Sequence, residues 1–154
     1  MKKPDKLICV RLASVADVDA LAKLLSILFE QEADFAPDFT RQTRALRLIV
    51  SNPEIGQIYC ATERREIVGM VSLLFTVSTA EGGRAAWMED MVVHPKKRRR
   101  GIGKRLLEEA MTGAEAAGCS RITLLTDADN EAGMVFYEQL GFSRSKMVPY
   151  RMHL

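Results

Sequence analysis

Apolar and polar positions along the chain follow two periods, one typical of helices and one typical of strands. Helical spacing is strongest from Gly101 to Ala117, where an apolar stripe recurs every three or four residues. Runs rich in β-branched and apolar residues, bounded by charged or glycine-containing turns, indicate strands. The pattern predicts helices at 15–29, 40–50, 101–117 and 131–140. It predicts strands at 7–12, 57–62, 67–78, 85–93 and 121–126, with one or two more from Phe142 onward, including 147–153.

This order of elements predicts a mixed sheet with helices packed on both faces, an α/β (α+β) architecture. The 154 residues suit a single domain spanning 1–154, and a hydrophobic content of 47% is enough for one full core. No apolar run approaches the roughly 18 residues needed to span a bilayer, so no membrane partner is expected. The polar start lacks a secretory signal, which predicts a cytoplasmic protein. Cysteines and histidines are few and far apart, so no metal site is predicted.

Positive charge is concentrated at one point of the chain. Net charge is +2, yet seven of the 22 basic residues lie between Lys96 and Arg105, a window without an acid. The rest of the chain has 15 basic and 20 acidic residues. A nucleic-acid-binding domain that uses 96–105 is one alternative, but such proteins usually spread positive charge over a face. The acidic remainder, and the lack of aromatic residues near the window for base stacking, argue against nucleic acid as a partner.

The basic window lies where a strand leads through a loop into the longest predicted helix. The first N–H groups of a helix have no partner within the helix and lie at the positive end of its dipole. Gly101 and Gly103 carry no Cβ, so an anion can approach the backbone closely. The arrangement predicts a phosphate or pyrophosphate site. Neither the dinucleotide fingerprint, whose third glycine would fall on Leu106, nor the P-loop matches this spacing.

The motif Arg98-x-x-Gly101-x-Gly103 resembles the coenzyme A loop of the GCN5-related N-acetyltransferase (GNAT) family. A second segment, from Asn130 to Phe142, resembles that family's Asn-x-x-Ala-x-x-Phe-Tyr-x-x-Leu-Gly-Phe pattern, with Gly133 in place of the usual alanine. The resemblance covers nearly the whole chain. It implies a mostly antiparallel sheet of six to seven strands, whose fourth and fifth strands splay apart to admit the pantetheine arm. It also implies acetyl-CoA as co-substrate, no metal, and pairing as a homodimer.

The resemblance assigns cofactor contacts to the fourth strand, the basic loop and the helix after the fifth strand. Main-chain groups of the strand would pair with the pantetheine amides, the loop would hold the pyrophosphate, and an asparagine would bond the pantetheine arm. The implied cofactor-binding residues are Met91, Val92, Val93, Arg98, Arg99, Arg100, Gly101, Ile102, Gly103, Lys104, Asn130 and Phe136.

Acetyl transfer to an amine requires a base for the amine and an acid for the leaving thiolate. The string Met88 to Val93 resembles the Glu-Asp strand of diamine and glucosamine-phosphate acetyltransferases, which makes Glu89 the candidate base, acting through water. Strand alternation predicts that Glu89 shares a face with Met91 and Val93, while Asp90 points the other way and supports the sheet. The resemblance makes Tyr137 the candidate acid, and an N–H near Met91 or Val92 would polarise the carbonyl.

Acidic and aromatic residues alternate between the first two predicted helices. In relatives this region covers the acceptor site, so Phe29, Glu32 and Asp34 are the expected substrate-binding residues. Acids and aromatics together suit a cationic amine through ion pairing and cation–π contact. The acceptor is expected to be a small cationic amine, an amino sugar, or an aminoacyl, peptide or protein amine. The alternative within the same fold is a non-catalytic module that senses acyl-CoA.

Overall fold

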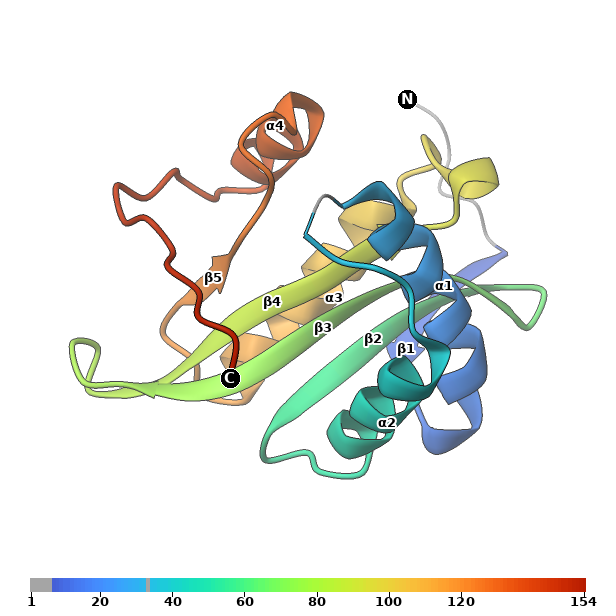
Figure 1. The fold of residues 1–154 in the computed structure, drawn as a ribbon, viewed down its shortest axis with the longest axis horizontal. Coiled ribbons are helices and arrows are strands. Elements are labelled where there is room, and N and C mark those ends of the chain that lie inside the picture. Colours follow the sequence, from blue (N-terminus) through green and yellow to red (C-terminus); the bar gives the residue numbers. More distant parts are fainter. Residues whose placement is uncertain (1–6, 33) are drawn as a thin grey trace.

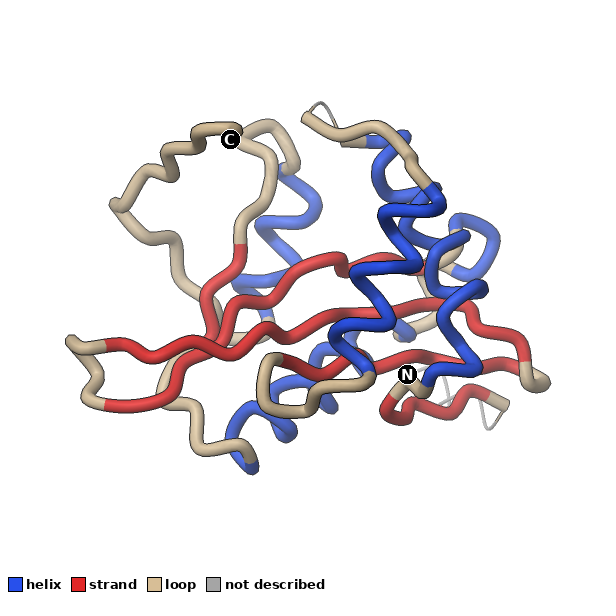
Figure 2. Tube along the Cα trace, turned by 60° about the horizontal axis from the view of Figure 1, so that its bottom comes forward, coloured by secondary structure: helices blue, strands red, loops and turns tan. Residues whose placement is uncertain are grey.

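The computed structural model describes residues 7–32 and 34–154, which form a five-stranded sheet with helices on both faces (Figures 1 and 2). The strands lie in the order β1-β2-β3-β4-β5, antiparallel except for the parallel pair β4–β5. The strands are β1 (Ile8–Leu12), β2 (Gly56–Glu63), β3 (Glu66–Ser78), β4 (Gly83–Val93) and β5 (Ile122–Leu124). The helices are α1 (Val18–Gln31), α2 (Phe39–Val50), α3 (Ile102–Ala116) and α4 (Glu131–Gln139), with 3₁₀ turns η1 (Val15–Asp17) and η2 (Pro95–Lys97).

Each face of the sheet is covered by its own apolar core. On one face α3 buries Ile102, Leu106 and Leu107 against β2, β3 and β4. On the other face α1 and α2 bury a second cluster, which includes Leu21 and Leu46. These stripes are the ones that the helical spacing predicts, and they confirm the layered α/β architecture. Within the described ranges, none of the helices combines the length and apolar character that crossing a bilayer would require.

The prediction of one or two strands after Phe142 is wrong. Residues 142–154, all of them described, contain no strand, and Tyr150 is 97% exposed, so its side chain packs against almost nothing. The alternation of 147–153 is strand-like, but a strand forms only where a neighbouring strand supplies hydrogen bonds along its length. The one edge strand near the C-terminal segment, β5, is three residues long. Over residues 7–32 and 34–154 the sheet therefore has five strands rather than six or seven.

The pairing of β4 with β5 is confined to three residues on each strand. Ala86, Trp87 and Met88 lie opposite Ile122, Thr123 and Leu124. Beyond Met88, β4 continues to Val93 without β5 beside it, and β4 diverges from the segment that follows β5 (Figure 1). The expected splay of the fourth and fifth strands is thereby confirmed. Trp87, the chain's single tryptophan, lies in the middle of this short pairing and is 37% exposed.

Gly56 begins β2 where that strand meets β3 too closely for a side chain. A Cβ added at Gly56 would lie 2.4 Å from the Leu73 carbonyl oxygen, which belongs to backbone and cannot rotate away. We expect Gly56→Ala to lower the free energy of unfolding by about 2 kcal/mol. Urea denaturation measures this. Gly83→Ala is the matched control, because nothing lies within 4 Å of its added Cβ. Equal stability of the two variants would contradict the expectation.

Candidate functional site

The loop between β4 and α3 opens the start of α3 toward solvent. Arg99 and Gly101 both adopt left-handed backbone conformations, with φ of 64° and 78°. A Cβ added at Gly101 would meet nothing within 4 Å, so the space beside this turn is open. Among the described residues, no side chain caps the first N–H groups of α3. The turn is therefore neither blocked nor buried, and its free amides can receive an anion.

The basic side chains of this loop are largely bound to the protein itself. Arg98 donates through Nε to the Val93 carbonyl, at 3.0 Å, and through its terminal nitrogen to Gln31 Oε1, at 3.3 Å. Arg100 is ion-paired with Glu63 at 2.6 Å. The expectation that all these cations face a phosphate does not fit Arg98 and Arg100, because acceptors of the protein already bind them. The Val93 carbonyl and the exposed Gln31 bind Arg98, and the buried Glu63 carboxylate binds Arg100. Arg99 has no partner among the described residues, and Lys104 makes only a loose contact of 3.6 Å with Glu108.

Gly103, in the first turn of α3, lies against β4 and α4. An added Cβ would lie 3.2 Å from Met91 Cε and 3.5 Å from Phe136 Cζ. Ile102, its neighbour, is 1% exposed and belongs to the core, so only its backbone can contact a ligand. The expected cofactor residues of β4, α3 and α4 are thus brought together at one corner, where the β4–β5 pairing has ended.

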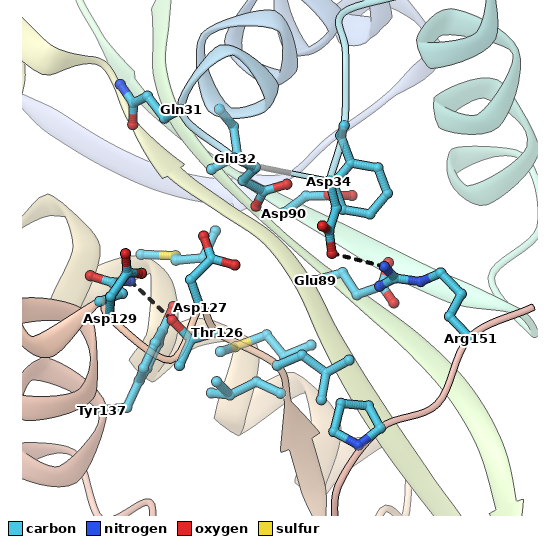
Figure 3. A pocket seen from close by; sticks show the side chains of 18 residues that line it. Gln31, Glu32, Asp34, Glu89, Asp90, Thr126, Asp127, Asp129, Tyr137 and Arg151 are labelled. Atoms are coloured by element: carbon cyan, nitrogen blue, oxygen red, sulfur yellow. Dashed lines mark hydrogen bonds and ion pairs between the residues drawn. The ribbon is translucent and has the colours of Figure 1, made fainter.

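A cavity of about 510 Å³ lies beside this corner, between the end of α1, the second half of β4, and the segment from β5 to α4. In Figure 3, Glu32 and Asp90 lie on one wall, and Asp127 and Tyr137 on the opposite wall. Among the described residues, six carboxylates line the cavity, and Arg151 is the only basic residue that lines it. The acidic residues are Glu32, Asp34, Glu89, Asp90, Asp127 and Asp129. The cavity therefore has a strongly negative potential.

A β-bulge in β4 sets the direction of Glu89 and Asp90. The register with β3 shifts between Met70 and Ser72, and Asp90 has a left-handed φ of 54°. Glu89 lies opposite Ser72, and the Ser72 hydroxyl donates to the Asp90 carboxylate at 3.4 Å.

The bulge overturns the face assignment made from alternation. Met91 and Val93 pack with the core under α3, and Val92 packs with the core under α1 and α2. Val71 and Leu73 also belong to the core under α3, so Ser72 between them, and Glu89 opposite it, face the side of α1. Glu89 does not share the face of Met91 and Val93, and Asp90 points into the cavity rather than away. The extra residue of a bulge interrupts the two-residue period on which the expectation relied.

Crowding of carboxylates raises proton affinity within the cavity. Burial, together with the charges of Glu89 and Glu32, raises the pKa of Asp90 to about 7. Burial also raises the pKa of Glu32, helped by Asp127 and other nearby acids. A carboxyl that titrates near neutrality can both take up and release a proton under ordinary conditions.

Tyr137 reaches the cavity from α4, held by neighbouring aromatic rings. Its ring centroid lies 5.4 Å from that of Phe136 and 5.9 Å from that of Phe142, in edge-on arrangements. Burial, and to a lesser extent Glu32, raise the pKa of Tyr137, so its hydroxyl stays protonated at neutral pH. Tyr137 therefore lines the cavity with a hydroxyl that is able to donate a proton.

Asn130 caps α4 and lines the cavity at the same time. Its side-chain oxygen accepts from the Gly133 N–H at 3.1 Å, and its amide nitrogen donates to Thr126 Oγ1 at 3.0 Å. A Cβ at Gly133 would lie 2.3 Å from that amide nitrogen. Glycine at 133 is therefore what lets the Asn130 side chain fold over the first turn of α4.

The expected acceptor residues have different positions. Glu32 and Asp34 line the cavity, whereas Phe29 does not and instead supports Phe35, whose ring centroid is 5.7 Å away. Phe35 lines the cavity and carries the Arg151 guanidinium over its ring at 5.3 Å. Arg151 also pairs with Asp34 at 3.0 Å (Figure 3).

Four charged residues of the cavity lie outside the site that the sequence predicts. Asp90 is expected only to support the sheet, and Asp127, Asp129 and Arg151 are not among the predicted site residues. Asp127 immediately follows the predicted strand 121–126, and a polar residue at a strand end is a signal that could have been used. Arg151 carries no comparable signal, because its approach depends on the path of an irregular segment.

Comparison with known proteins agrees with this arrangement. Residues 19–142 match the model of the Acetyltransferase (GNAT) family. An uncharacterized N-acetyltransferase of Bacillus subtilis, YhfO, is 32% identical over 86% of this chain and 88% of its own length. A glucosamine 6-phosphate N-acetyltransferase of Trypanosoma brucei brucei is 34% identical over 57% of this chain, a match that spans only 58% of that protein.

A solved structure shares the fold. A predicted acetyltransferase of Clostridium acetobutylicum, determined with acetyl-CoA, superposes with a TM-score of 0.79 over 94% of this chain and 96% of its own, at 18% identity. The family match extends from α1 through α4 and includes the Arg98–Gly103 turn, the bulged strand and all six carboxylates of the cavity. On these grounds the chain belongs to the GNAT acetyltransferase family.

Proposed function

We propose that this protein is an acetyl-CoA-dependent N-acetyltransferase whose acceptor is a small cationic amine. One observation carries the choice of acceptor: the cavity that meets the end of the β4–β5 pairing is lined by six carboxylates and a protonated tyrosine. Family membership supports the acetyl transfer, and the cavity supports the charge of the acceptor.

The residues at the corner of β4, α3 and α4 suit coenzyme A. The open turn at Gly101 and the uncapped amides of α3 fit a diphosphate, with Arg99 and Lys104 beside them. The stretch of β4 beyond Met88 leaves backbone groups available on the side from which β5 has diverged. Such an edge suits a ligand arm that contains amides. Bound acetyl-CoA would supply an activated acetyl thioester at this corner.

Two side chains have the proton affinities that the transfer needs. Asp90 is the proposed acceptor of the proton from the ammonium group, since its pKa of about 7 matches that task. Glu89, the residue indicated by family resemblance, lines the same cavity and is the alternative. Tyr137 is the proposed donor of a proton to the departing sulfur. The N–H groups of Met91 and Val92, next to the bulge, are the proposed partners of the reacting carbonyl oxygen.

Arg151 illustrates how the cavity binds a cation. Its guanidinium is held by an ion pair with Asp34 and by the face of Phe35. An ammonium group has the same charge and can make the same two kinds of contact. Five further carboxylates line the cavity, and burial, together with repulsion from neighbouring acids, raises the pKa values of Glu32 and Asp90. A cationic acceptor would relieve that repulsion.

A panel of amines that differ in charge tests this proposal. Release of the coenzyme A thiol from acetyl-CoA would be measured with four acceptors. These are a diamine, a monoamine with no other charged group, glucosamine 6-phosphate and a peptide amine. We expect the diamine to have the lowest KM. Asp127→Asn should raise that KM about tenfold by removing one attracting charge, while the KM for acetyl-CoA stays constant. Glu115→Gln, an exposed change on α3, is the control.

Two results would contradict the proposal in different ways. Preference for the phosphorylated amino sugar would refute the cationic acceptor but leave acetyl transfer intact. Binding of acetyl-CoA without thiol release for any amine would favour the alternative, a sensor module.

A further inference from the structure

The turn that precedes α3 is held in place by a carboxylate from another part of the sheet. Glu63 is the last residue of β2 and lies opposite Ile8 on β1 and Glu66 on β3. One of its oxygens accepts from Arg100 at 2.6 Å, and the other accepts from Lys97. Glu63 is only 9% exposed, so both ion pairs lie at the edge of the packed interior.

These contacts surround a strained backbone. Lys97 and Arg100 flank Arg99, whose left-handed φ of 64° is unfavourable for a residue with a side chain. Such a conformation persists only where the surroundings enforce it. Arg98 is bound to Val93 and Gln31, and Arg105 donates to the Ile8 carbonyl at 2.8 Å, so the turn is anchored from several sides.

Hydrogen bonds from Arg100 and Lys97 lower the pKa of Glu63 to about 2. The Glu63 carboxylate is therefore charged throughout the pH range of an assay, and its ion pairs with Arg100 and Lys97 do not depend on pH within that range. It also occupies two of the loop's cations, so they are directed to the sheet rather than to a ligand.

We infer that Glu63 is a positioning residue: it sets the affinity of the Arg98–Gly103 turn for coenzyme A by holding that turn in its binding shape, without touching the ligand. The inference rests on the proposed function. Preorganisation lowers the cost of binding, because the turn need not be ordered when the diphosphate arrives. The effect belongs to cofactor binding and leaves the chemistry at Asp90 and Tyr137 unaltered.

Glu63→Gln keeps the size of the side chain and removes its charge. We expect the Kd for coenzyme A, measured by calorimetry, to rise about tenfold. The KM for acetyl-CoA should rise by a similar factor, with kcat within about twofold of the original. Loss of folded protein alone would lower kcat and leave KM unchanged. Glu66→Gln is the matched control for charge. Glu66 lies opposite Glu63 on the same hairpin, but its carboxylate makes no ion pair among the described residues, so the change should alter neither the Kd for coenzyme A nor the KM for acetyl-CoA.

A second variant protects the test against misfolding. Lys97→Gln removes one of the two cations and should weaken coenzyme A binding by a smaller factor. Combining it with Glu63→Gln should add little, because both changes act on one interaction. An unchanged or tighter Kd for Glu63→Gln would overturn the inference, since freed cations would then be assisting the phosphates directly. Failure of the unsubstituted protein to bind coenzyme A would overturn the proposed function as well.

Discussion

Asp90→Asn should lower kcat about 100-fold and at the same time make the protein more stable near pH 8. The amide cannot accept the amine's proton, so the loss of rate follows from the proposed role. Asparagine adopts left-handed backbone conformations readily, so the φ of 54° and the bulge should survive. Glu89→Gln is the matched control and should cost at most about tenfold.

The gain in stability follows from the sign of the pKa shift. Asp90 titrates at about 7 in the folded protein against an ordinary value of 3.8, so the folded state binds its proton more tightly. That contribution favours folding at low pH and is lost as the pH rises through about 7. An ionised Asp90 is therefore unfavourable near pH 8, and the neutral amide should recover roughly 2 kcal/mol.

Urea denaturation of both proteins near pH 5 and pH 8, together with steady-state kinetics, measures the two effects. A larger loss of kcat for Glu89→Gln than for Asp90→Asn would assign the proton to Glu89. Equal stability of Asp90→Asn and the original protein near pH 8 would contradict the burial of the charge.

Tyr137→Phe should lower kcat about 100-fold while leaving the KM for acetyl-CoA within about twofold. The ring keeps its edge-on contacts with Phe136 and Phe142, so α4 should stay in place. Only the hydroxyl is lost, and with it the proposed proton for the departing sulfur. Since burial raises the pKa of Tyr137, the original enzyme should show no loss of rate from this group until the pH exceeds about 10.

The control for this change is Tyr150→Phe, which removes the same hydroxyl from a side chain that is 97% exposed. Its kcat should equal that of the original protein. An acetyl thioester whose thiol has a low pKa offers a further check. Its thiolate leaves without being protonated, so Tyr137→Phe and the original protein should react with it at similar rates. An unchanged kcat for Tyr137→Phe would remove the tyrosine from the mechanism.

Sequence reasoning predicted the elements whose formation depends on local pattern. The amphipathic stripes of α1 and α3 and the hairpin of β2 and β3 appear within a few residues of their expected bounds. The Arg98–Gly103 turn was also predictable, because the spacing of its glycines and the start of a helix are properties of neighbouring residues. The family motif indicates Asn130 and Tyr137, and the acidic loop between the first two helices indicates Glu32 and Asp34; all four line one cavity.

What escaped prediction depends on residues far apart in the sequence. The bulge at Asp90 exists only in the register of β4 against β3, so alternation along β4 alone gave the wrong faces. Gln31, which binds Arg98, and Glu63, which binds Arg100, lie 67 and 37 positions away from them in the chain, and no local pattern identifies them. The last strands failed for a related reason, because an alternating segment still needs a neighbour of sufficient length.

The position of Trp87 gives the protein an optical reporter. It is the only indole in the chain, and it lies in the three-residue pairing at whose end the proposed thioester arm would enter. Its emission can be excited separately from the tyrosines, and its partial exposure makes it sensitive to quenchers. Titrating the unlabelled enzyme with coenzyme A should therefore change its fluorescence directly, which gives an affinity for the cofactor before any acceptor has been identified.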